Sequence, residues 1–134
     1  MSLRGPDAAA AVLARYIGFK DREHFAVLHL DSRHRIRGVE IVAIGTLSAA
    51  MVHPREIFKG AILSNAASLI CGHNHPSGDP LPSDDDRTIH EKLRKAGELL
   101  DIEVLDHIVL GDGSYYSVQS EQWAPIPEWP PQSS

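Results

Sequence analysis

Residues 68–86 read SLICGHNHPSGDPLPSDDD, and this stretch sets the organisation of the chain. Residues 68–72 form a short apolar run, which is typical of a buried strand. Residues 73–82 are interrupted by three prolines, which excludes a helix or a central strand there. A helix is expected to begin at Ser83 and to run to about Ala96, with Gly97 as its stop. The stretch therefore predicts a strand, a stiff loop and a helix in direct succession.

The segments on either side predict further helices and strands, which together suit one domain of 134 residues. Their order, α-β-β-α-β-α-β-β, predicts a mixed α/β fold with one main mixed sheet flanked by helices. The expected elements are a helix opened by Pro6 and Asp7, strands over 23–30 and 35–44, a helix from Pro54, and strands over 102–110 and 115–118.

The two ends of the chain differ in composition from the part between them. We expect the domain to cover residues 7–120. Residues 1–6 are expected to be a disordered lead or a cloning remnant. Residues 124–134 contain several prolines and are expected to form an extended or disordered tail.

Composition excludes several classes of protein. No apolar run approaches the roughly 20 residues of a membrane helix, so no membrane role is expected. The single cysteine, Cys71, rules out an internal disulfide and a zinc site built on cysteine clusters, and it favours a cytoplasmic location. The net charge of −5 argues against a general polyanion binder. The acidic second half of the chain suits a cation better than a phosphate.

Two histidines at the end of the predicted strand are the first candidates for chemistry. His73 and His75 are two residues apart, and extended backbone places such side chains on the same side. Two neutral imidazoles on one face are a natural start for a divalent metal site. Asp86, in the first turn of the next helix, can return to the same ion. Three protein ligands would leave a fourth position on Zn²⁺ for water, as in catalytic zinc sites.

A hydrolytic zinc site also needs a general base and a donor for the developing oxyanion. Glu23, at the head of the first strand, is the candidate base, and Glu40 on the next strand is its competitor. Ser83, at the head of the helix that carries Asp86, is the candidate donor.

The run from Ser83 to Asp86 also has a purely structural interpretation. Ser83 and Asp86 together form a helix-capping signature, and three carboxylates in a row favour the positive end of a helix dipole. This interpretation needs no metal, although it does not explain the two histidines. Asp79, Asp84 and Asp85 are alternative carboxylate ligands.

Two further features allow both a functional and a structural interpretation. Asp106 and His107 either orient a metal ligand, as carboxylate–histidine pairs do, or form a structural hydrogen bond in the sheet. Arg33, Arg35 and Arg37 form either a nucleic-acid site or a solvated hairpin edge that discourages strand aggregation.

Several of these motifs together resemble the JAMM (MPN+) zinc metallopeptidase superfamily. The likeness rests on Glu23 followed by Phe25 and Val27, on His-Asn-His-Pro-Ser-Gly over 73–78, and on Ser83-x-x-Asp86. Within it, the sequence is similar to the carboxy-terminal domain of bacterial RadC-like proteins. The residues that carry this second likeness are Gly45-Thr46-Leu47, His53-Pro54-Arg55-Glu56 and Asp106-His107.

The resemblance implies a fold, a cofactor and an activity. It implies a cytidine-deaminase-like α/β fold and one Zn²⁺ per chain, bound by His73, His75 and Asp86. It also implies that Glu23 is the acid/base and that Ser83 helps to stabilise the tetrahedral intermediate. Characterised superfamily members cleave amide or isopeptide bonds, so a zinc metallopeptidase acting on a protein or peptide is expected.

The RadC branch carries a second implication. Its members usually have an additional amino-terminal helical domain, and their name is linked to DNA repair. The alternative expectation is therefore an accessory module of DNA repair or recombination, which binds nucleic acid or protein partners without catalysis.

Overall fold

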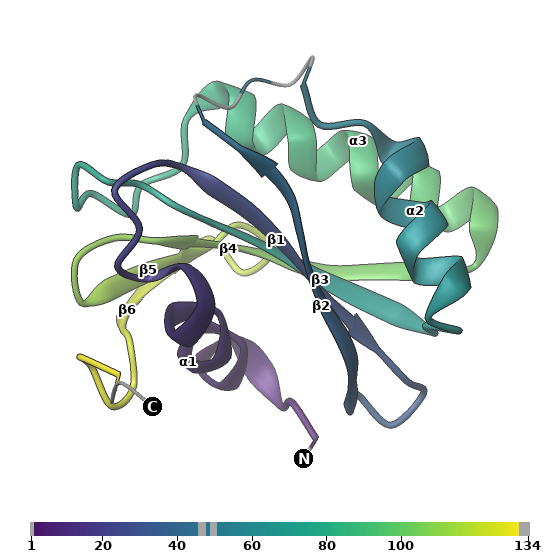
Figure 1. The fold of residues 1–134 in the computed structure, drawn as a ribbon, viewed down its shortest axis with the longest axis horizontal. Coiled ribbons are helices and arrows are strands. Elements are labelled where there is room, and N and C mark those ends of the chain that lie inside the picture. The colour runs from purple at the N-terminus through teal and green to yellow at the C-terminus, as the bar shows by residue number, and fades with distance from the viewer. Residues whose placement is uncertain (1, 46–47, 49–50, 132–134) are drawn as a thin grey trace.

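A computed structural model describes residues 2–45, 48 and 51–131 and shows a six-stranded sheet with helices on both faces (Figure 1). The strand order is β2-β1-β3-β4-β5-β6; β3 and β4 are parallel, and all other neighbours are antiparallel. The predicted mixed α/β class is confirmed. The elements are α1 (Gly5–Ile17), β1 (His24–Leu30), β2 (Ile36–Ile44), α2 (Pro54–Leu63), β3 (Ser68–Asn74), α3 (Asp84–Leu100), β4 (Glu103–Leu110), β5 (Ser114–Ser117) and β6 (Gln122–Pro125).

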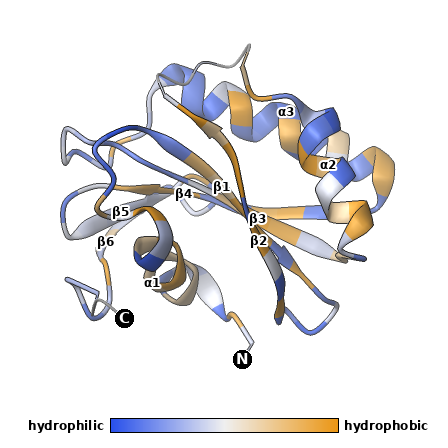
Figure 2. Cartoon of the chain, in the orientation of Figure 1, coloured by the Kyte–Doolittle hydropathy of each residue, from blue (hydrophilic) through white to orange (hydrophobic). Residues whose placement is uncertain are grey.

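The sheet separates two hydrophobic cores. Helix α1 covers one face, where Leu13 packs with Leu28. Helices α2 and α3 cover the other face, where Phe58 and Leu93 pack with Val27. The central strand β1 is hydrophobic along most of its length (Figure 2), and β1 and β3 are buried at nearly every position, as their apolar runs predict. No helix in the described part of the chain combines the length and apolar character needed to cross a membrane.

Strand β3 is two residues longer than the sequence predicts. It continues through His73 and Asn74, which the sequence places in the proline-rich loop. The first proline of that loop is Pro76, so the backbone groups of His73 and Asn74 remain able to pair with neighbouring strands. His73 is opposite Phe25 of β1 and Val109 of β4. The predicted end of the strand at residue 72 is therefore wrong.

Helix α3 passes through Gly97, which the sequence predicts as its stop, and ends at Leu100. The residue that ends it is Asp101, which adopts a left-handed conformation with φ of 55°. A Cβ atom on Gly97 would lie 2.3 Å from the carbonyl oxygen of Ile102 and 3.4 Å from the ring of Phe58. The glycine therefore allows a close approach of two backbones and does not end the helix.

Both ends of the described chain contribute to the structure. Ser2 forms a β-bridge with Arg35, and the Leu3 side chain is buried, so residues 2–6 are not a disordered lead. At the other end, residues 122–125 form β6, and the Ile126 side chain is buried. The ring of Trp129 stacks on Phe19 with centroids 4.9 Å apart. The tail is therefore extended at first and then folds back; Met1 and residues 132–134 lie outside the described residues.

The packing of Gly97 predicts that Gly97→Ala destabilises the protein. Overpacking of this kind costs about 1–3 kcal/mol of unfolding free energy, which exceeds the gain of up to about 1 kcal/mol from replacing a helical glycine. Urea unfolding measures the change. Gly38→Ala is the matched control, because its Cβ would meet nothing closer than 3.8 Å. A Gly97→Ala protein as stable as the wild type would contradict the close packing.

Candidate metal centre

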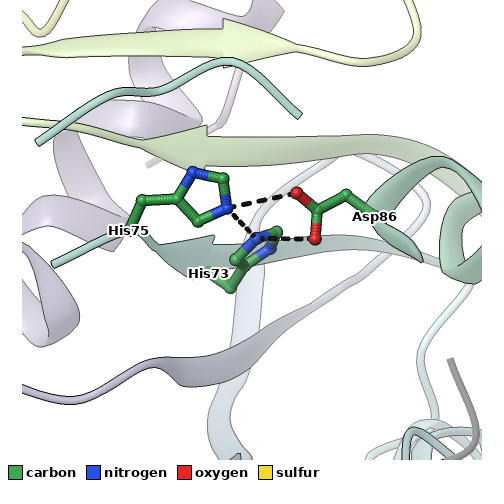
Figure 3. Close-up of side chains that lie close together, drawn as sticks. All are labelled: His73, His75 and Asp86. Atoms are coloured by element: carbon green, nitrogen blue, oxygen red, sulfur yellow. Dashed lines mark hydrogen bonds and ion pairs between the residues drawn. The ribbon is translucent and has the colours of Figure 1, made fainter. Parts of the chain in front are cut away.

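His73 and His75 point to the same side of the chain at the end of β3, as the two-residue spacing predicts. Their Nε2 atoms lie 3.0 Å apart. The Asp86 carboxylate faces both imidazoles: Oδ1 lies 3.0 Å from Nε2 of His73, and Oδ2 lies 3.1 Å from Nε2 of His75 (Figure 3). The structure thus brings the three predicted ligands together from a strand, a loop and a helix.

Asp86 reaches this position because it also caps helix α3. Its backbone N–H donates to Oγ of Ser83 at 3.1 Å, and the Ser83 N–H donates to Oδ2 of Asp86 at 2.8 Å. These reciprocal bonds form a capping box. The structural interpretation is therefore correct and is compatible with the functional one, because the cap presents the carboxylate to the histidines.

The loop between β3 and α3 holds His75 in one tautomer. Its Nδ1 lies 2.8 Å from the backbone carbonyl oxygen of Asp79. A carbonyl oxygen can only accept, so Nδ1 carries a proton, and a neutral His75 ring has its lone pair on Nε2, the nitrogen that a metal would bind. Gly78, with φ of +93°, makes the turn; its N–H donates to the carbonyl of His75, and its own carbonyl accepts from Asp112.

The electrostatics of the site favour a cation. Burial would raise the pKa of the Asp86 carboxyl, but the hydrogen bonds from His73 and His75 outweigh burial and hold the pKa well below its usual range. Burial would lower the pKa of His75, but its hydrogen bonds to Asp86 and the Asp79 carbonyl leave that pKa raised. An ionised carboxylate therefore lies between two imidazoles, largely out of water.

The three donor groups fit a zinc ion. They are the one group of this kind that the described residues form, with ligand atoms within 4.8 Å of one another. Bonds of 2.0–2.1 Å in a tetrahedral site place neighbouring ligand atoms about 3.3 Å apart. The two Nε2 atoms are 3.0 Å apart, and each lies 3.0 or 3.1 Å from a different oxygen of the Asp86 carboxylate. Imidazole nitrogen and carboxylate oxygen are also ligands that zinc accepts. His73, His75 and Asp86 could therefore hold the metal.

Glu23, the predicted base, lies directly before β1 and is partly buried. The charge of its carboxylate adds to the raised pKa of His75, a smaller contribution than the hydrogen bonds to Asp86 and to the Asp79 carbonyl. Asn74 fixes the backbone on both sides of Glu23. Oδ1 of Asn74 accepts from the His24 N–H at 2.7 Å, and Nδ2 donates to the carbonyl of Arg22 at 2.9 Å. Sequence reasoning missed this role of Asn74, although the residue stands between the two histidines.

The alternative candidates lie elsewhere. Glu40 has its Oε1 2.9 Å from Nε2 of His29, which is not one of the three predicted ligands. Asp79 uses a carboxylate oxygen to accept from the Leu81 N–H, at 3.0 Å. Asp84 and Asp85 are exposed in the first turn of α3.

The histidine of the Asp106-His107 pair is directed at the site, whereas the aspartate is not. Nε2 of His107 lies 2.7 Å from Nδ1 of His73. The carboxylate of Asp106 accepts from Oγ of Ser117 at 2.6 Å and from the backbone N–H groups of His107 and Gln119. His107 therefore contacts a predicted metal ligand, and Asp106 forms structural hydrogen bonds.

The predicted basic edge lies at the far end of β1 from Glu23. Arg35 pairs with the Asp31 carboxylate at 3.1 Å, and Arg37 donates to the Ser64 carbonyl at 3.2 Å. Arg33 is exposed in the turn. Binding of nucleic acid by these arginines stays a prediction.

The geometry predicts one zinc ion per chain and a strong dependence on His75. His75→Ala removes one of three ligands, so zinc affinity should fall by more than the roughly 10–100-fold typical of changes outside the ligand set. Isothermal titration calorimetry measures both the number of zinc ions bound per chain and the zinc affinity. His53→Ala is the control, because His53 is exposed and its side chain makes no capping bond. Equal zinc affinity of the wild type and His75→Ala would refute the assignment.

The capping box predicts a cost in stability for Ser83→Ala in the metal-free protein. Losing the side-chain acceptor at a helix N-cap costs about 1 kcal/mol of unfolding free energy. Chemical denaturation tests this, with Thr88→Ala, an exposed hydroxyl on the same helix, as the comparison. If the two variants unfold alike, Ser83 does not cap α3.

Comparison with known proteins agrees with this geometry. The model of the family described as "RadC-like JAB domain" matches residues 3–123. A UPF0758 protein of Desulforudis audaxviator is 47% identical over 120 residues, 90% of this chain and 52% of that protein. One from Methanosarcina acetivorans is 52% identical over 100 residues, 75% of this chain and 44% of that protein.

The chain thus spans about half the length of these curated relatives. The resemblance to RadC-like proteins is confirmed, and the mixed sheet flanked by helices is consistent with the JAB/MPN fold. Two residues of the motifs behind the resemblance, Thr46 and Leu47, lie outside the described residues. With a family match over nearly its whole length and two relatives near 50% identity, this chain belongs to the RadC-like JAB domain family.

Proposed function

We propose that this chain is a zinc-dependent hydrolase that cleaves amide or isopeptide bonds in a protein or peptide substrate. The observation that carries the proposal is the convergence of two imidazole Nε2 atoms and one carboxylate at spacings of 3.0 and 3.1 Å. Membership of the JAB domain family supports the same function, because that family includes metalloproteases.

The three ligands differ in exposure. The side chain of His73 is 2% exposed and that of Asp86 8%, whereas that of His75 is 15% exposed. Substrate therefore approaches from the side of His75. When bound there, zinc would polarise the substrate carbonyl and make a water molecule acidic enough to attack near neutral pH.

Glu23 supplies the proton transfers. Its carboxylate takes a proton from the attacking water and then gives a proton to the leaving amine. Amines leave poorly unless they are protonated, so a positioned acid/base matters most for amide and isopeptide bonds. The hydrogen bonds of Asn74 to the backbone of Arg22 and His24 keep Glu23 in place during both transfers.

Ser83 stabilises the oxyanion. Its Oγ already accepts the N–H of Asp86, but a hydroxyl that accepts one bond still has its own proton to donate. The hydroxyl can therefore donate a hydrogen bond to the oxyanion of the tetrahedral intermediate. The residue can thus cap the helix and assist the reaction at the same time.

The proposal predicts that Glu23→Gln abolishes hydrolysis and leaves zinc bound. Loss of a general acid/base lowers rates by about 10²–10⁴-fold. The zinc-loaded protein is incubated with a denatured extract of cellular proteins, and new amino groups, terminal and lysine, are labelled and identified by mass spectrometry. The control is Glu40→Gln, whose partner in the structure is His29.

The amine signals of the three proteins separate the possible outcomes. Wild type and Glu40→Gln should release the same new amines, and Glu23→Gln should release almost none. Equal signals from the zinc-loaded wild type and Glu23→Gln would contradict the hydrolytic role of Glu23.

A further inference from the structure

His73 and His75 differ in the group that their Nδ1 atom contacts. Nδ1 of His75 donates to the backbone carbonyl of Asp79. Nδ1 of His73 instead lies 2.7 Å from Nε2 of His107, another imidazole. The side chain of His107 is 0% exposed, so solvent cannot replace this contact. Any role of the contact in metal binding rests on the proposed zinc site, which requires a lone pair on Nε2 of His73.

An irregularity in the sheet brings His107 to this position. In the pairing of β3 with β4, Leu69 is opposite Val104, and the next residue, Ile70, is opposite Asp106, so Leu105 has no partner on β3. In a regular strand Val104 and Ile108 would share one face. Here Val104 packs on the side of α2 and α3, whereas Ile108 packs on the side of α1.

The bulge therefore shifts the alternation of β4 by one residue. His107 consequently lies on the same face as His73, against its ring, with ring centroids 4.9 Å apart. Without the extra residue, His107 would point to the opposite core.

The contact between two imidazole nitrogens holds one proton, and its location decides which nitrogen of His73 can bind a metal. If His107 donated from Nε2, a neutral His73 would carry its proton on Nε2, where the metal binds. If His73 donates from Nδ1, a neutral His73 ring has its lone pair on Nε2, where it can bind a metal ion. His107 must then be the neutral tautomer with its proton on Nδ1, a buried atom that has no hydrogen-bond partner among the described residues.

We propose that His107 is a positioning residue that accepts a hydrogen bond from Nδ1 of His73 and so directs the Nε2 lone pair of His73 to the zinc ion. Partners outside the ligand set commonly fix tautomer and ring orientation in this way, with a carboxylate or a carbonyl as the usual acceptor. Here the nearby carboxylate, that of Asp106, already accepts hydrogen bonds from Ser117 and from backbone N–H groups. A neutral imidazole takes its place and adds no negative charge to the site.

The first test compares zinc affinities, measured by competition with a chromophoric chelator. His107→Leu removes the acceptor and should weaken zinc binding by about 10–100-fold. His107→Gln offers its side-chain oxygen near the position of Nε2 and should bind zinc more tightly than the leucine variant. His29→Leu is the matched control, since His29 is a buried histidine whose Nε2 pairs with the Glu40 carboxylate. Wild-type affinity in His107→Leu would overturn the proposal.

The second test needs no variant and remains decisive if the substituted proteins fail to fold. Long-range ¹H–¹⁵N spectra of the zinc-loaded wild type report which ring nitrogen of each histidine carries a proton. We expect protons on Nδ1 of both His73 and His107, with Nε2 of His107 unprotonated. A proton on Nε2 of His107 would overturn the proposal. Failure of the wild type to bind zinc would instead refute the metal site itself and, with it, this inference.

Discussion

The carboxylate of Asp86 is held by a helix cap and faces two imidazoles, and the arrangement of the site depends on this double contact. The cap sets where helix α3 begins, and it presents the carboxylate to the end of β3. Burial of an ionised carboxylate is costly unless cationic or hydrogen-bonding groups surround it. His73, His75 and the Ser83 N–H meet that requirement, which explains why the pKa of Asp86 is held below its usual range.

Around this contact, each group that takes part in the proposed chemistry is oriented by a different segment. The carbonyl of Asp79 sets the tautomer of His75, His107 is proposed to set that of His73, and Asn74 ties down the backbone beside Glu23. These supports come from the loop after β3, from β4 and from β3 itself. The sheet order, with β3 between β1 and β4, is what allows them to meet.

Much of this arrangement could be predicted because it depends on local spacing. The two-residue period of extended backbone places His73 and His75 together, and Ser83-x-x-Asp86 predicts the capping box. The bulge opposite β3 could not be predicted, because Leu105 looks like an ordinary core residue of an apolar strand. The side-chain bonds of Asn74 reach residues 50 and 52 positions away, so no local pattern reveals them.

The prediction that failed at Gly97 has a related cause. Glycine is common where helices end, but here it makes room for the backbone of Ile102, a tertiary contact that no helical pattern encodes. X-ray absorption at the zinc K edge of the zinc-loaded protein tests the central claim, zinc held by His73, His75 and Asp86, most directly. Two imidazole nitrogens and carboxylate oxygen are expected at about 2.0–2.2 Å from the metal. A sulfur shell at about 2.3 Å, or fewer than two imidazoles, would contradict this ligand set.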